Sequence, residues 1–153
     1  MKNYIMVFFC SIIMLAGSCS QPAEEKEKNR IKSTADNFAE NYFNFRLADS
    51  RMFCTEESAA WLSFLASNMQ QEDVDILKAQ DKGATCKALS INIINDTTAT
   101  ACYRVFNFMR IDTLGRAGKM TEQADYTITL VKRHSKWHVK MEGLLQSERQ
   151  NRG

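Results

Sequence analysis

The sequence has little excess charge of either sign. Its 20 basic and 18 acidic residues leave a formal net charge of +2, which falls to +1 without residues 1–18, whose one charged side chain is Lys2. Nucleic-acid binding rests on neutralising many phosphates, which a near-neutral chain does poorly. The composition therefore predicts no nucleic-acid partner.

The signatures of several enzyme and cofactor classes are also missing. The chain has no glycine-rich phosphate-binding loop, no cysteine set at metal-ligand spacing and no nucleophile elbow. Its two histidines, His134 and His138, are four residues apart, which makes neighbours on a helix, but a turn is expected between them. We interpret both as surface residues, and we expect neither a metal nor a cofactor.

What is present is enough apolar material for one folded domain. The chain has 153 residues, of which 44% are hydrophobic and 10% aromatic. At its start Lys2 precedes a mostly apolar run over residues 4–15, followed by the small residues 16–18. This pattern predicts a secretory signal peptide over residues 1–18, which is too short to span a bilayer comfortably as a mature helix.

A cysteine follows the small residues directly. The segment Leu15-Ala16-Gly17-Ser18-Cys19 resembles a bacterial lipobox, with Ala16 where leucine is commonest. The resemblance implies that the signal is cut before Cys19, whose sulfur is diacylated and whose new amino group is often acylated too. Two or more inserted acyl chains anchor a protein stably. The alternative is a plain signal peptide followed by an incidental cysteine.

The residues after Cys19 bear on location and domain organisation. In the sorting rules that the resemblance implies, aspartate after the cysteine favours the inner membrane. Ser20 stands there instead, so we expect the outer membrane. The domain could face either the periplasm or the cell surface. Residues 19–29 are polar and predict a lipidated flexible tether. We expect the folded domain over residues 30–145 and a polar tail over residues 146–153.

Apolar periodicity predicts three helices. Residues 31–48 carry apolar side chains close to a period of 3.6. Thr55 is suited to cap a second helix, since Glu56 and Glu57 follow it in the first turn. A third, shorter helix is expected over residues 72–80, before Gly83.

The period then changes to two, which predicts four strands. They cover residues 85–94, 99–111, 119–131 and 137–143, with turn signals between them. Simple hairpins align the apolar side chains on one face and pair Ile91 with Tyr103, Tyr103 with Ile128, and Leu130 with Val139, with Leu89 on the same face. The fold class is therefore α+β, with three helices covering a four-stranded antiparallel meander.

Three bulky apolar residues break this alternation: Phe106, Phe108 and Met109. One interpretation is a strongly bent strand that contributes both of its faces to the core. The other is a pocket rim or a dimer contact on an exposed sheet face.

The order of elements resembles the nuclear transport factor 2-like, or ketosteroid-isomerase-like, cone of the cystatin-like architecture. The stretches that carry the resemblance are STADNFAENYFNFRLADSRMFCTEESAAWL and ADYTITLVKRHSKWHVKMEG. It implies a strongly curved sheet and a space between helices and sheet that often holds a small ligand, sometimes with a pocket Asp or His acting as base. Because this fold hosts many functions, function has to be argued from a site.

The expected site is an aromatic cavity, either filled by its own side chains or open to an apolar guest. Its lining is predicted to be Phe38, Tyr42, Trp61, Tyr103 and Tyr126. The nearest carboxylates are Asp36, which lies beside the apolar helix face, and Asp125, which alternates outward. We interpret both as solvated carboxylates rather than general bases.

The domain has three cysteines besides Cys19, so at most one intramolecular disulfide can form among them. If one exists, Cys54 is a partner and Cys86 the favoured second; a fully reduced trio with Cys102 is the equal alternative. The hairpin with Lys132, Arg133, Lys136 and Lys140 could meet anionic lipid or glycan, or it could protect a sheet edge from aggregation.

These observations favour a membrane-anchored envelope protein that binds a small apolar ligand or a protein partner without catalysis. One alternative is an isomerase or dehydratase, which requires a carboxylate or histidine inside the cavity. Another is a dimeric scaffold formed through the sheet, which requires Phe106, Phe108 and Met109 to be exposed on a shared face.

Overall fold

The computed structural model describes residues 22–149. The predicted signal peptide, Cys19 and residues 150–153 lie outside the described residues. The elements are α1 (Ala23–Phe43), α2 (Leu47–Ser50), the 3-10 helix η1 (Arg51–Phe53), α3 (Glu56–Ser67), α4 (Gln71–Lys78), β1 (Thr85–Asn95), β2 (Thr98–Arg110), β3 (Lys119–Arg133) and β4 (Lys136–Lys140).

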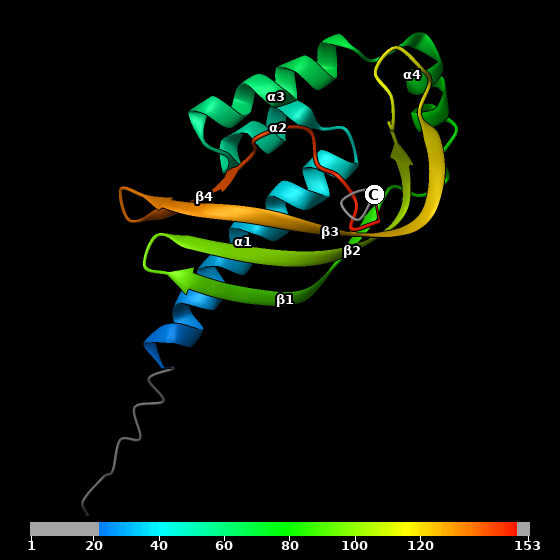
Figure 1. Cartoon of the computed structure of the whole chain (residues 1–153). Coiled ribbons are helices and arrows are strands. Elements are labelled where there is room, and N and C mark those ends of the chain that lie inside the picture. Colours follow the sequence, from blue (N-terminus) through cyan, green and yellow to red (C-terminus); the bar gives the residue numbers. More distant parts are fainter. Residues whose placement is uncertain (1–21, 150–153) are drawn as a thin grey trace, which may run out of the picture.

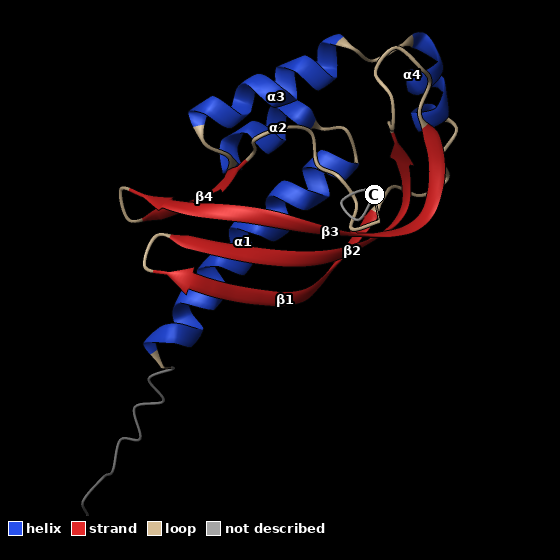
Figure 2. Cartoon of the chain, viewed as in Figure 1, coloured by secondary structure: helices blue, strands red, loops and turns tan. Residues whose placement is uncertain are grey.

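The four strands form one antiparallel meander in the order β1-β2-β3-β4. Helix α1 crosses the sheet diagonally, and β2 and β3 curl toward α4 at one end (Figure 1). The other helices gather on the same side of the sheet (Figure 2). The α+β class is confirmed, with α2 and η1 added to the three predicted helices. No helix within residues 22–149 is long and apolar enough to cross a bilayer.

Helix α1 begins well before the predicted start of the folded domain. Residues 23–29, assigned above to the tether, are helical. Glu27 in this stretch accepts hydrogen bonds from Lys132 Nζ and, at 2.8 Å, from Trp137 Nε1. Polar composition alone predicted a tether here, but side chains from the distant β3–β4 hairpin hold this turn of the helix.

The start of α3 agrees with the prediction. Thr55 caps it, because its Oγ1 accepts from Ser58 N at 3.3 Å. Ser58 Oγ in turn accepts from the backbone N of Met141 at 2.8 Å, which ties the helix to the end of β4. Leu62 and Leu65 are buried on the inner face, as expected.

Helix α4 is held by one buried carboxylate. Asp73 is 1% exposed, and its two oxygens accept from Gln70 N at 2.8 Å and from Gly118 N at 2.6 Å. The first contact completes a capping box at the start of the helix. The second joins α4 to the β2–β3 connection, so Asp73 fastens the end of the molecule where the sheet curls.

The predicted strand register is right in one hairpin and two residues off in the others. Leu130 pairs with Val139, as expected. Ile91 and Ile128 both pair with Ala101, whereas the prediction placed Tyr103 opposite them. A two-residue offset keeps Ile91 and Ile128 on their predicted face, because strand side chains alternate with period two.

Leu89 is an exception to the predicted inner face. The register of β1 shifts between Ala88 and Ser90, which makes Leu89 the extra residue of a bulge, and it is 45% exposed. A second shift between Ile93 and Asn95 leaves Ile94 61% exposed. Bulges bend and twist an edge strand, so both apolar side chains turn away from the core.

The irregular end of β2 follows from a single bend. Asn107 has a φ of +51°, and its side-chain amide donates to Lys82 O at 2.7 Å. The bend changes the face of the following residues, so that Phe108 is 1% and Met109 2% exposed. The interpretation of a bent strand that gives both faces to the core is confirmed for Phe108 and Met109, whereas Phe106 is half-buried at an open groove. The exposure of Phe108 and Met109 that a dimer through this strand requires is not present.

The predicted polar tail is partly folded onto the sheet. Ser147 is buried, and its backbone forms an antiparallel β-bridge with Tyr126. Glu148 N donates to Asp125 O at 2.9 Å. Thr127 Oγ1 donates to the Glu148 carboxylate at 2.6 Å. Residues 147 and 148 therefore continue along the edge of β3 beyond the end of β4, where the prediction had only a polar tail from residue 146.

Candidate functional site

The expected aromatic cavity is almost completely filled. Phe38, Tyr42, Tyr103 and Tyr126 are all buried, and the space between helices and sheet measures about 30 Å³. Tyr42 and Tyr126 line it together with Phe43, whose ring centroid lies 4.7 Å from that of Tyr126. A ligand pocket holds several hundred Å³, so this space suits about one water molecule.

The other predicted lining residues serve the core. Phe38 stacks on Tyr42 at 5.5 Å, and Trp61, half-buried on α3, meets Phe64 edge-on at 6.0 Å without lining the cavity. Tyr42 accepts from Leu145 N at 3.4 Å, and burial raises the pKa of Tyr42 to about 12. Of the described residues around the cavity, none is an Asp, Glu or His.

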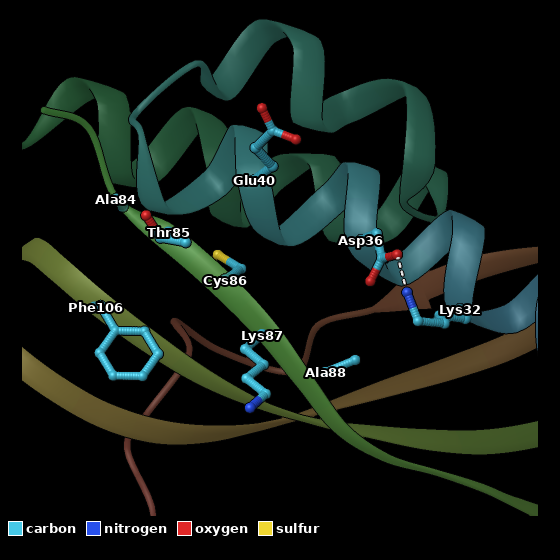
Figure 3. A pocket seen from close by; sticks show the side chains of 9 residues that line it. All are labelled: Lys32, Asp36, Glu40, Ala84, Thr85, Cys86, Lys87, Ala88 and Phe106. Carbon is cyan, nitrogen blue, oxygen red and sulfur yellow. Dashed lines mark hydrogen bonds and ion pairs between the residues drawn. The ribbon is translucent and has the colours of Figure 1, made fainter.

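A much larger hollow is an open groove of about 810 Å³ between α1 and the edge strand β1 (Figure 3). One wall is a row of charged side chains four residues apart on α1: Lys32, Asp36 and Glu40. The other is the start of β1 and its neighbours. These residues are Ala84, Thr85, Cys86, Lys87, Ala88 and Phe106.

Asp36 is bound more closely than the sequence suggested. Its Oδ1 accepts a 2.5 Å hydrogen bond from the hydroxyl of Tyr103, which is fully buried, and its Oδ2 pairs with Lys32 Nζ at 2.5 Å. Burial first, and then Asp36, raise the pKa of Tyr103 above its ordinary value. The Asp36 carboxylate is half-exposed, in keeping with the interpretation of a solvated group, but it also satisfies a buried hydroxyl that has to find a partner.

Asn44 closes one end of the groove. Its side-chain amide donates to Ala84 O at 3.1 Å and accepts from Ala84 N at 2.8 Å, which fastens the start of β1 to the end of α1. A Cβ at Gly83 would lie 2.4 Å from Asn44 Oδ1, so only glycine allows this approach. Sequence reasoning missed this pair, although a glycine before a strand is a weak signal for a close approach.

Cys86 lies in the groove as a protonated thiol. Burial, followed by the carboxylates of Glu40 and Asp36, raises its pKa to about 12. Because a thiol needs its thiolate form to react, Cys86 is a poor nucleophile at neutral pH.

The described cysteines Cys54, Cys86 and Cys102 are all free thiols, so the favoured Cys54–Cys86 disulfide is not formed. The backbone of Cys54 forms an isolated β-bridge with Val139 of β4, whereas Cys86 lies on β1 at the opposite edge of the sheet. Three strand spacings, about 14 Å, separate those edges. A disulfide needs Cα atoms within about 7 Å.

The remaining polar candidates lie outside the groove. Asp125 forms a two-bond ion pair with Arg104 at 2.8 and 2.9 Å, and this pairing lowers the pKa of Asp125. His134 occupies the β3–β4 turn and His138 lies on β4. Within residues 22–149 no three His, Cys, Asp or Glu side chains gather closely enough to hold a metal ion.

No protein-family description and no curated protein matches the chain. Among solved structures, an NTF-2 like protein of unknown function from Shewanella oneidensis is similar at 11% identity and a TM-score of 0.48, over 75% of this chain and 95% of that one. The association domain of C. elegans CaMKII is similar at 12% identity and a TM-score of 0.43, over 76% and 92%. Likenesses of this size carry no information on function.

Proposed function

We propose that this chain is a lipid-anchored domain of the bacterial outer membrane that binds an extended polypeptide segment without catalysis. The lipobox-like segment ending at Cys19 supports the anchor. The contrast between the filled interior, with about 30 Å³ left, and the open groove of about 810 Å³ supports binding at the α1–β1 groove.

The backbone of β1 favours a polypeptide as the occupant. β1 is an edge strand, and nothing within the described residues pairs with its outer side. From Thr85 to Ala88, the part that lines the groove, its pairing with β2 is regular until the bulge at Leu89. An edge with free N–H and C=O groups can accept a further strand, and this stretch offers room for about four residues of one.

The side chains favour the same occupant over a small apolar guest. Lys32, Asp36, Glu40 and Lys87 place both signs of charge along the groove, and Lys32 is bound to Asp36 while Glu40 is bound to Arg46 at 3.2 Å. A small apolar guest makes no use of these charges, whereas main-chain hydrogen bonds provide affinity for a polypeptide of any sequence. Selectivity then comes from the charged row on α1.

The groove is tested by photocrosslinking in the native membrane fraction. A benzophenone-bearing residue replaces Lys87, and the matched control carries it in place of Lys119, at the start of β3 and outside the groove. We expect a partner to be crosslinked only through position 87. We also expect a synthetic peptide of the crosslinked segment to slow amide hydrogen exchange over Thr85–Ala88. Equal crosslinking from both positions, or a peptide without effect on those amides, contradicts the proposal.

The crosslink also tests the scaffold hypothesis, in which β1 pairs with a second β1: a crosslink between two copies of this chain favours it. The isomerase or dehydratase hypothesis needs a separate activity assay of the purified chain, and turnover of a small metabolite favours it, with Asp36 as the carboxylate to test.

The anchor is tested by fractionation of cells that produce the chain or its Cys19→Ala variant. We expect the wild-type chain with the outer membrane, and its mature form to be lost from that fraction in the variant. An unchanged distribution contradicts the anchor.

A further inference from the structure

A second groove lies at the other end of α1, against the β3–β4 hairpin. It measures about 440 Å³ and is formed by the N-terminal half of α1, by η1 and by the hairpin. Its base includes the buried Trp137 and half-buried Phe53, and Met52 at its rim is 74% exposed. Met52 and the apolar base thus present apolar side chains to an occupant of the groove.

The charge of this groove has one sign. Arg30 and Lys136 line it with His138 and the hydroxyls of Ser33 and Thr34, and of its described lining residues none is acidic. Glu27 lies beside it: its Oε1 is bound by Lys132 and Trp137, and its Oε2 approaches Arg30 only at 3.5 Å. Cationic and hydroxyl groups over an apolar base fit a phosphate that carries apolar chains.

The length of chain before α1 places a bilayer near this groove. Cys19 precedes Ala23, the first residue of α1, by four residues, which reach at most about 14 Å when extended. Arg30 lies about 10 Å further along the helix. The start of α1 and the tips of the β1–β2 and β3–β4 hairpins lie at one end of the molecule, away from α4 (Figure 1).

We infer that this groove receives the phosphate headgroup of an anionic phospholipid in the membrane to which Cys19 is anchored. The inference rests on the proposed anchor. Arg30 and Lys136 bind the phosphate, and Met52 lies among the headgroups. The domain then has a fixed orientation, with the β1–β2 and β3–β4 hairpins against the bilayer and α4 pointing away from it.

The two tryptophans provide a matched test. Trp137 lines the groove, whereas Trp61 lies on α3 outside it. Trp61→Phe leaves Trp137 as the single reporter, and Trp137→Phe leaves Trp61. The lipidated full chain is placed in vesicles of phosphatidylglycerol or phosphatidylcholine with a nitroxide-labelled headgroup lipid, and the loss of tryptophan emission is measured. We expect a larger loss for Trp137 than for Trp61, and a larger loss in phosphatidylglycerol.

Charge variants test the groove itself. We expect Arg30→Ala with Lys136→Ala to reduce the phosphatidylglycerol-dependent loss, each removed charge weakening headgroup binding about fivefold, which is about 1 kcal/mol per basic side chain. The control pair, Lys78→Ala with Lys82→Ala, lies near α4 and leaves the loss unchanged. The inference is overturned if both tryptophans lose the same emission, or if the loss does not depend on lipid charge. It is also overturned if the loss of emission follows protein concentration, because a second copy then fills the groove.

Failure of the anchor is distinguishable from failure of this site. Intact mass of each preparation reports whether Cys19 is acylated. If it is not, the anchor proposal fails, and vesicles added to the free protein test the groove alone: phosphatidylglycerol-dependent quenching of Trp137 supports a headgroup site, and its absence overturns one.

Discussion

The contact between Asp36 and Tyr103 gives the most informative prediction on the candidate site. Tyr103 is fully buried, and its hydroxyl donates to the half-exposed Asp36 carboxylate at 2.5 Å. A hydrogen bond to a charged group contributes about 1.5–3 kcal/mol, and an unsatisfied buried hydroxyl costs about 1–3 kcal/mol. We therefore expect Asp36→Ala to lower the free energy of unfolding by about 2–3 kcal/mol, and Tyr103→Phe by about 1–2 kcal/mol.

The assay is urea unfolding followed by far-ultraviolet circular dichroism, completed by the double variant. Because both single variants lose the same contact, their effects should fall short of additivity by about 1.5 kcal/mol or more. Glu40→Ala is the matched control: it lies four residues further along α1 in the same groove, and its exposed ion pair with Arg46 is worth about 0.5 kcal/mol. Additive effects, or an Asp36→Ala loss no larger than that of Glu40→Ala, refute the assignment of Asp36 to a structural role.

Three further predictions concern stability. Asp73→Ala should lower the free energy of unfolding by about 2–4 kcal/mol in urea, because two backbone N–H groups lose their buried acceptor; a loss under about 1 kcal/mol contradicts this. The two-bond pairing with Arg133 lowers the pKa of Glu57 to about 2, below its unfolded value near 4.5. The stability that this ion pair contributes is therefore fully present above pH 4.5 and is lost as pH falls toward 2. In acid titrations of stability, Glu57→Gln should flatten that region, and an unchanged slope contradicts the pairing. His134 and Ser135 have φ of +50° and +65° in the two-residue β3–β4 turn. Replacing them by His134→Asn and Ser135→Gly should relieve about 1 kcal/mol of backbone strain per residue and so raise the melting temperature. A lower melting temperature contradicts the turn geometry.

Much of the fold follows from patterns that are local in the sequence. The change from a period of 3.6 to a period of two locates the helices and strands, and Thr55 marks the start of α3. The exceptions have local physical causes that periodicity does not contain. Leu89 is the extra residue of a bulge, and Asn107 adopts a left-handed conformation that changes the face of Phe108.

The candidate site is harder to predict because its contacts join distant residues. Asp36 and Tyr103 are 67 positions apart, and Asn44 and Ala84 are 40 apart. Glu27 belongs to a stretch with almost no apolar residues, and its partners Lys132 and Trp137 fix it in the helix. The prediction of an aromatic interior was useful, since four of its five residues are core residues, but packing density decides whether such an interior is empty.

The proposed anchor at Cys19 matters most, because it would place the protein in the envelope and bring one end of the domain to the bilayer. The direct measurement is intact mass spectrometry of the protein purified from its native membrane fraction, beside the Cys19→Ala variant. We predict a chain that begins at Cys19 and carries the added mass of its acyl chains, and no such species from the variant. A mature chain that begins elsewhere, or that begins at an unmodified Cys19, contradicts the account.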